Sequence, residues 1–155
     1  MKLTLNLYVV STAKGLGGGL PIGATMFGEK VKDIFAPGLN GSTFGANPVC
    51  CSGAINVISR LTDEFLEEVT KKACLIKDTL SGADGIESIS GLGLMVGIKT
   101  VKEAKEVVAL CRERGVLVLT AKDKVRLLPP LNIENSQLTA ALNIIKEVCK
   151  QWNTY

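Results

Sequence analysis

Four residues of this 155-residue chain have types and neighbours that suit chemistry: Lys14, Ser42, Thr43 and Arg126. Lys14 follows a short apolar segment and precedes the glycine-rich residues 15–21. An amine at the end of a strand, beside backbone with few side chains, can reach and attack a carbonyl group if its surroundings keep it partly neutral. A solvated lysine at a strand end gives the same pattern. Composition alone leaves both interpretations open.

The other three residues also allow two interpretations each. Ser42 and Thr43 lie between Gly41 and Gly45, where hydroxyls and backbone N–H groups can bind a phosphate or simply form a tight turn. Arg126 interrupts a strongly apolar segment. A guanidinium in such a strand can hold a carboxylate through two parallel hydrogen bonds, or point into water from the edge of a sheet.

The absence of histidine narrows the possible chemistry. With no histidine in the chain, histidine-activated nucleophiles, histidine metal ligands and histidine acid–base catalysis are excluded. The five cysteines form no Cys-x-x-Cys pair, and we expect them to be reduced and mostly buried. The glycine-rich segment fits neither the dinucleotide-binding pattern nor the P-loop pattern. Any catalysis would therefore use lysine, carboxylates, hydroxyls or a cofactor.

Composition points to a globular protein. The chain is 46% hydrophobic and carries a net charge of +3 from 18 basic and 15 acidic residues. The apolar content suffices for a packed core, and the small charge without basic runs gives no reason to expect a nucleic-acid partner. The longest uncharged stretch, residues 34–59, is interrupted by proline and glycine and predicts no membrane span. Because no cleavage site follows the apolar N-terminal patch, we expect a cytoplasmic protein without a signal peptide.

Apolar spacing and turn residues predict the elements that would position these side chains. The expected strands cover residues 5–11, 22–27, 92–98, 116–120 and 125–128. One expected helix begins after Pro48. Three more cover residues 64–80, 102–114 and 136–152, and the helix over 64–80 starts at a Thr62 or Asp63 cap. The β-α-β-β-α order of the last third predicts a small α+β unit with its helices on one face of a sheet. A change of pattern near Leu61 predicts two parts joined by a long helix.

Three sequence motifs resemble those of one known family, the class III aminotransferases, which depend on pyridoxal 5'-phosphate (PLP). They read STAKGLGGGLPIGA at residues 11–24, GSTFGANP at 41–48 and VRLLPPL at 125–131, in the order that the family has them. The segment GLGLMVG at residues 91–97 adds similarity to the acetylornithine aminotransferase branch. The resemblance runs from about residue 9 to the C-terminus.

This resemblance implies an α/β fold, the C-terminal part of the type I PLP-dependent transferase fold. Residues 1–60 would form the end of the large PLP-binding domain, and residues 61–155 the connecting helix and the α+β small domain. The implied reaction moves an amino group between N-acetylornithine and 2-oxoglutarate in arginine biosynthesis. The alternatives are another class III aminotransferase, acting on ornithine or 4-aminobutyrate, and a non-catalytic remnant of such an enzyme.

The resemblance also implies a role for each of the four residues. Lys14 would bind the cofactor aldehyde as a Schiff base and later carry the proton between substrate and cofactor. Thr43, supported by Ser42, would contact the cofactor phosphate of the neighbouring subunit, which implies a homodimer. Arg126 would bind the α-carboxylate of the amino-acid or 2-oxo-acid substrate. The cofactor would supply the electron sink.

The chain departs from the family pattern at several positions. Asn40 stands where histidine is frequent, Ala46 where glycine is usual, and Ser90 where arginine is common. Leu7 and Tyr8 occupy the place of a Pro-Asp pair. The family's first half, with the carboxylate that pairs with the cofactor ring and the main phosphate site, has no counterpart here. We therefore expect a fragment with little or no transaminase activity by itself.

Overall fold

The computed structural model describes residues 8–150. Its contacts divide the chain into two compact units, residues 1–65 (unit 1) and 66–155 (unit 2), which are described separately below. Of the predicted first strand, residues 5–7 lie outside the described part of the chain, as do residues 151–152 of the predicted last helix. Within the described residues, no helix has both the length and the apolar character needed to cross a membrane.

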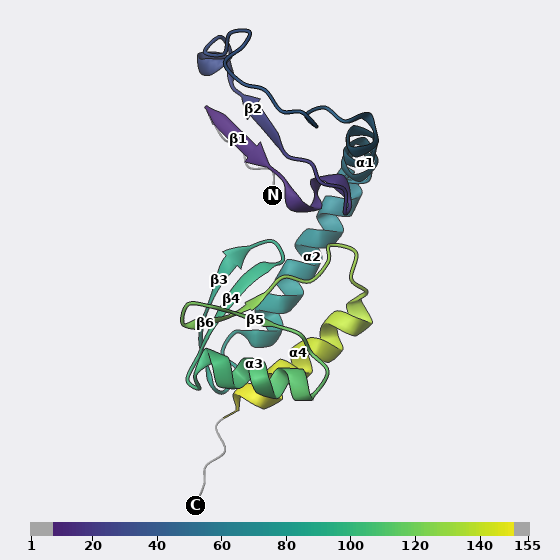
Figure 1. The fold of residues 1–155 in the computed structure, drawn as a ribbon. Helices are drawn as coiled ribbons and strands as arrows, with labels where there is room; N and C mark the ends of the chain where they lie inside the picture. The colour runs from purple at the N-terminus through teal and green to yellow at the C-terminus, as the bar shows by residue number, and fades with distance from the viewer. Residues whose placement is uncertain (1–7, 151–155) are drawn as a thin grey trace, which may run out of the picture. The chain divides into compact units, whose positions relative to one another are not determined.

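Unit 1 is built around a two-stranded antiparallel sheet and one helix (Figure 1). Strand β1 (Val9–Thr12) leads into the short 3-10 helix η1 (Lys14–Gly17), and strand β2 (Ala24–Phe27) returns beside β1. A second 3-10 turn, η2 (Glu29–Val31), and a long loop then lead to helix α1 (Pro48–Ser59). The glycine-rich segment is thus a connection between two strands, as the sequence predicts.

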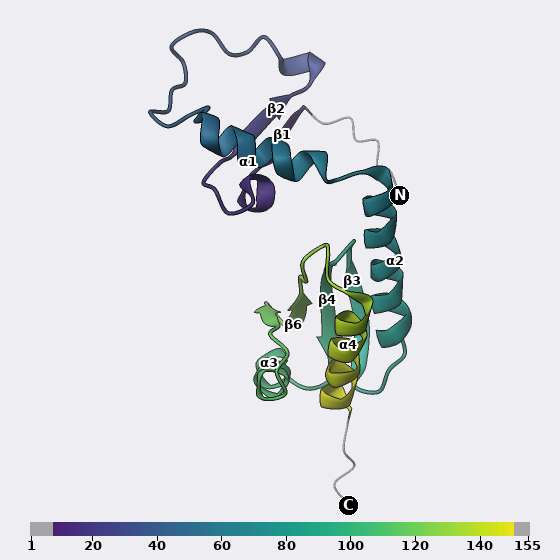
Figure 2. The same ribbon diagram turned by 90° about the vertical axis from the view of Figure 1, so that its right-hand side faces the viewer.

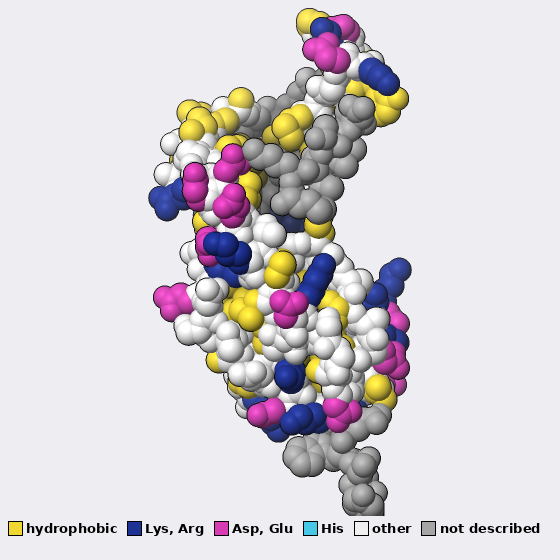
Figure 3. All heavy atoms as spheres, turned by 180° about the vertical axis from the view of Figure 1, so that it is seen from behind, with side chains coloured by type: hydrophobic (Ala, Val, Ile, Leu, Met, Phe, Trp, Pro, Cys, Tyr) yellow, Lys and Arg dark blue, Asp and Glu magenta, His cyan; other side chains and the backbone are white. Residues whose placement is uncertain are grey.

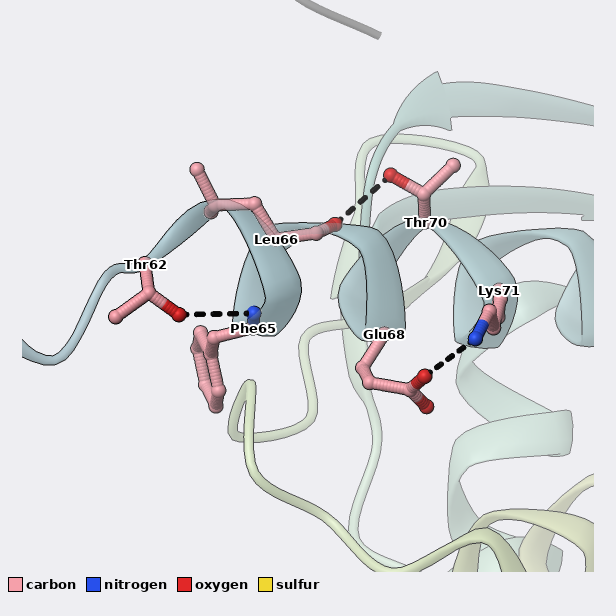
Figure 4. A network of polar contacts seen from close by, with 6 residues as sticks. All are labelled: Thr62, Phe65, Leu66, Glu68, Thr70 and Lys71. Carbon is pink, nitrogen blue, oxygen red and sulfur yellow. Dashed lines mark hydrogen bonds and ion pairs between the residues drawn. The ribbon is translucent and has the colours of Figure 1, made fainter.

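Both helices near the unit boundary begin where the sequence predicts them. The Asn47 side chain accepts hydrogen bonds from the backbone N–H groups of Val49 and Cys50, at 3.0 and 3.3 Å, and so caps α1. Helix α2 (Asp63–Leu80) follows Thr62, whose hydroxyl accepts a hydrogen bond from the Phe65 N–H at 3.2 Å (Figure 4). Side-chain oxygens at these positions satisfy N–H groups that have no partner in the first helical turn.

Unit 2 contains a four-stranded antiparallel sheet with the strand order β3-β4-β6-β5. Besides the greater part of α2, its elements are β3 (Ile86–Leu92), β4 (Met95–Thr100), α3 (Ala104–Glu113), β5 (Leu119–Ala121), β6 (Lys124–Leu127) and α4 (Asn135–Cys149). Figure 2 shows α4 beside the strands and α3 below them.

One prediction for unit 2 is wrong. Residues 92–98 do not form a single strand, because the chain reverses after Leu92 and β3 pairs with β4 as a hairpin. Gly93 takes a left-handed φ of +58° in this reversal, a conformation that glycine adopts without steric penalty. The observed order is therefore β-β-α-β-β-α, one strand more than predicted. The strand predicted at residues 116–120 also begins later, at Leu119.

Alternation along the strands gives the sheet one buried and one accessible face. Val96, Ile98, Val125 and Leu127 are buried, and they belong to one apolar cluster with side chains of α2, α3 and α4. Residues between them in the sequence are only half-buried. The helices thus cover a single face, as predicted. The opposite face carries Lys99, Lys124 and Arg126 together with the exposed Met95 and Leu119.

The cysteines are free, but they are less uniformly buried than predicted. Cys111 and Cys149 are buried in unit 2, Cys50 and Cys51 are half-buried, and Cys74 is exposed. Desolvation raises the pKa of both buried thiols, that of Cys149 to about 11. A raised pKa lowers the fraction of thiolate, the form that reacts with alkylating reagents.

Brief treatment of the native protein with iodoacetamide at pH 8 is therefore expected to label Cys74 and to spare Cys111 and Cys149. Mass spectrometry of the tryptic peptides measures this pattern, and the same treatment in urea provides the control in which every cysteine is labelled. Equal labelling of Cys74 and Cys149 in the native protein would contradict the packing described for unit 2.

Candidate functional site

Lys14 occupies a strained position where β1 ends and η1 begins. Its φ is +57°, one of three positive values among the non-glycine residues described, and such values are uncommon for residues with a Cβ atom. The side chain is exposed, and among residues 8–150 no hydrogen bond or ion pair to it is found. The described part of unit 1 therefore leaves the amine accessible.

Close packing of glycines fixes the turn that carries Lys14. A Cβ atom at Gly17 would lie 2.7 Å from Ile22 Cγ2, and one at Gly53 would lie 2.7 Å from Leu20 Cδ1 and 2.9 Å from the Gly17 carbonyl oxygen. Separations this short require movement of one partner. The glycines therefore let η1 lie directly against α1, which holds the backbone of Lys14 in place.

Ser42 and Thr43 lie in a tight turn shortly before α1. The Gly45 N–H donates to the Ser42 carbonyl oxygen at 3.1 Å, and Ala46 has a left-handed φ of +55°. Both hydroxyl residues are exposed. This turn precedes the N-terminus of α1, whereas η1 packs against the middle of the helix at Gly53, so Lys14 and the turn lie at different places along α1.

Arg126 lies on the accessible face of the unit 2 sheet. Its strand position pairs with Gly97 on β4, and Gly97 pairs in turn with Ser90 on β3. The guanidinium Nε is buried without a hydrogen-bond partner, and it is the one such side-chain atom found in the described chain. A buried N–H group without an acceptor is unfavourable by about 1–3 kcal/mol. An added carboxylate would remove this penalty.

Two lysines accompany Arg126 on the same face. Lys99 pairs with Asp123 at 2.8 Å, and this contact lowers the pKa of Asp123 and raises the pKa of Lys99. Lys124 donates instead to the neutral hydroxyl of Ser90 at 2.8 Å. Sequence reasoning missed Lys124; its alternation with Arg126 on one strand was the available signal.

The four predicted residues are distributed over both units. Unit 1 contains Lys14, Ser42 and Thr43, and unit 2 contains Arg126. A shallow pocket of about 590 Å³ in unit 1 includes none of them and is lined by Leu20, Pro48, Val49, Ser52, Gly53 and Asn56. No group of three or more potential metal ligands occurs within residues 8–150.

The donor set of unit 1 fits a cofactor that carries an aldehyde and a phosphate. An accessible primary amine, here that of Lys14, condenses with aldehydes. The hydroxyls of Ser42 and Thr43, exposed in a turn that precedes α1 in the chain, are suitable donors to a phosphate. These residues could hold PLP.

Comparison with known proteins identifies the family. The family model described as Aminotransferase class-III matches residues 6–149. The acetylornithine aminotransferase of Haemophilus ducreyi is 44% identical over 145 residues, and that of Methanothermobacter thermautotrophicus is 40% identical over 146. The alignments cover 92% and 90% of this chain but 37% of each relative, so the chain spans little more than a third of their length.

Solved structures give the same result for the fold. The ornithine aminotransferase of Toxoplasma gondii superposes with a TM-score of 0.81 at 28% identity, covering 92% of this chain and 36% of that one. The acetylornithine aminotransferase of Elizabethkingia anophelis gives a TM-score of 0.77 at 26% identity, covering 94% and 41%. The predicted α/β fold and the predicted family are thereby confirmed, and the chain belongs to the class III aminotransferases.

Proposed function

We propose that this chain carries the lysine and the substrate arginine of a PLP-dependent aminotransferase that moves an amino group between N-acetylornithine and 2-oxoglutarate. The observation that carries the proposal is the position of Lys14. Its amine is accessible, its backbone has a left-handed φ of +57°, and it belongs to the segment that matches the family. Non-glycine residues held in such conformations concentrate at functional sites.

Each residue has a distinct task in this proposal. PLP, when bound, would supply the electron sink of the reaction. Lys14 would hold the cofactor and then accept and return a proton at its Nζ atom. Ser42 and Thr43 would donate hydrogen bonds to a phosphate of the neighbouring subunit in a homodimer. Arg126 would orient the substrate carboxylate, using the Nε–H that has no partner in the structure.

Acetylornithine is the preferred amino donor because the curated relatives at 35–44% identity carry the name acetylornithine aminotransferase. Ornithine is the second candidate, since solved ornithine aminotransferases share the fold at 28% identity. The reaction would take place in the cytoplasm. Because the chain spans 37% of the relatives' length, we expect turnover by the chain alone to lie below detection.

The proposal is tested by trapping the cofactor. The chain is incubated with PLP and reduced with borohydride, and the labelled peptide is identified by mass spectrometry. Lys14 is expected to carry most of the label, well above Lys30 and Lys32, which are lysines of the same unit without a glycine-rich turn. The Lys14→Arg variant should lose this label and keep the background at the other two. Uniform labelling of lysines, unchanged by Lys14→Arg, would refute the proposed role.

A further inference from the structure

On the accessible face of the unit 2 sheet, a second cation, the Lys124 ammonium group, extends toward the row of strand positions that contains Arg126. Register places Ser90, Gly97 and Arg126 side by side on β3, β4 and β6. Lys124 is two residues before Arg126 and pairs with Lys99, one level away. Its side chain nevertheless leans toward this row, because its Nζ donates to Ser90 Oγ at 2.8 Å.

Gly97 makes this path available. A Cβ atom at Gly97 would lie 3.2 Å from Lys124 Cδ and 3.4 Å from Ser90 Oγ, both tight contacts. The Ser90 hydroxyl also donates to the Gly97 carbonyl oxygen at 3.4 Å. The missing side chain at Gly97 thus lets the lysine methylenes cross β4, and Ser90 fixes where the ammonium group ends.

The charges on this face are unevenly compensated. Asp123 neutralises Lys99 at 2.8 Å, and the acidic Glu87 also acts on Lys99. By contrast, no carboxylate of residues 8–150 lies within ion-pair distance of Lys124 or Arg126. The Asp123 carboxylate acts on Lys124 only from beyond ion-pair distance. Two cations without an ion pair, attached to one short strand, repel each other, and a ligand with two negative groups would relieve both charges.

We propose that Lys124 is a second cationic contact for the substrate beside Arg126, and that it makes the site prefer dicarboxylates to monocarboxylates. This inference rests on the proposed role of Arg126 in binding a substrate carboxylate. Neighbouring strands are about 4.8 Å apart, so Ser90 on β3, which fixes the ammonium group, lies about 9.6 Å from Arg126 on β6. An extended five-carbon dicarboxylate with one hydrogen bond at each end can bridge this separation. Ser90 uses one of the three ammonium N–H donors of Lys124, and two remain for a ligand.

The test measures binding of 2-oxoglutarate and of the monocarboxylate 2-oxobutyrate to the full chain, by NMR titration at low ionic strength. The wild-type chain is expected to bind 2-oxoglutarate about tenfold more tightly, the ratio typical of one additional charged hydrogen bond. Lys124→Met keeps the methylenes over Gly97 but removes the charge. It should abolish the preference for 2-oxoglutarate without weakening the binding of 2-oxobutyrate. Lys124→Arg should preserve the ratio, and so should Lys105→Met, which removes an exposed lysine from α3.

The outcomes separate this inference from the proposed function. A preference for 2-oxoglutarate that survives in Lys124→Met, or is absent from the wild-type chain, overturns the role of Lys124. Lys124→Met could fail to fold while Lys124→Arg folds, and Lys124→Gln then replaces it in the binding test. If Lys124→Gln keeps the wild-type ratio of the two binding constants, Lys124 has a structural role and the inference is overturned. Arg126→Met should weaken the binding of both ligands. If it weakens neither, the proposed role of Arg126 fails instead.

Discussion

Replacement of Gly85 by alanine is expected to destabilise unit 2 by more than about 3 kcal/mol, and to leave little of it folded at 37 °C. Gly85 has a φ of +76°, and a Cβ atom there would overlap the Cys149 carbonyl oxygen and lie 2.6 Å from the Cys149 carbonyl carbon. Both are backbone atoms at the end of α4, so no side-chain rotation can relieve the overlap. The loop and the helix would have to separate, which would expose the buried Cys149.

Gly82 provides a matched control in the same loop between α2 and β3. Its φ of +71° is similar, but a Cβ atom there would meet no other atom within 4 Å. Gly82→Ala is therefore expected to lose about 1 kcal/mol, the backbone penalty alone. Urea denaturation followed by circular dichroism measures both variants. Equal losses would show that backbone conformation, and not the close approach of α4, determines the effect at Gly85.

The strand that the sequence analysis missed shows where periodicity fails. The apolar residues of β3 are Ile86, Ile89 and Leu92, which recur every three residues, because the pairing with β4 shifts between Ile86 and Ser88. Such a bulge breaks the two-residue alternation by which a strand is identified. The helices α1 and α2 were predictable because their signals, Asn47-Pro48 and Thr62, are local.

The same distinction between local signals and long-range pairing applies to the candidate site. Lys14, Ser42, Thr43 and Arg126 belong to contiguous motifs, and a sequence alone can reveal such motifs. The role of Lys124 depends on Ser90, which is 34 residues away and becomes its neighbour only through the order of the strands. A Schiff-base role for Lys14 also needs surroundings that keep a lysine amine partly neutral. The exposure of this residue depends on which surfaces cover unit 1, and no local pattern encodes that.

The two units are expected to differ strongly in amide hydrogen exchange. Among the described residues of unit 1, only Gly17 and Ala54 are buried, and large apolar side chains such as Met26 and Ile55 are exposed. Apolar side chains reach the surface of this unit in Figure 3. The remaining buried apolar residues belong to unit 2. Because a two-stranded sheet without a core is marginally stable, β2 amides should exchange at least about a hundredfold faster than β4 amides after correction for intrinsic rates.

The exchange experiment also addresses how Lys14 could work. If the β2 amides are protected from exchange as strongly as the β4 amides, contacts other than those within unit 1 stabilise this unit. Protection that rises with protein concentration would then identify a second copy of the chain as the source of these contacts, which is the homodimer that the proposed function requires.

If β2 exchanges fast, the Lys14 turn is held only by its packing on α1 through Gly17 and Gly53. Addition of PLP should then slow exchange in η1 before it slows exchange in β2, because the cofactor would bind the turn directly and the strand only through it. Simultaneous slowing of both, at a PLP concentration that leaves Lys14 unmodified, would contradict this order of stabilisation.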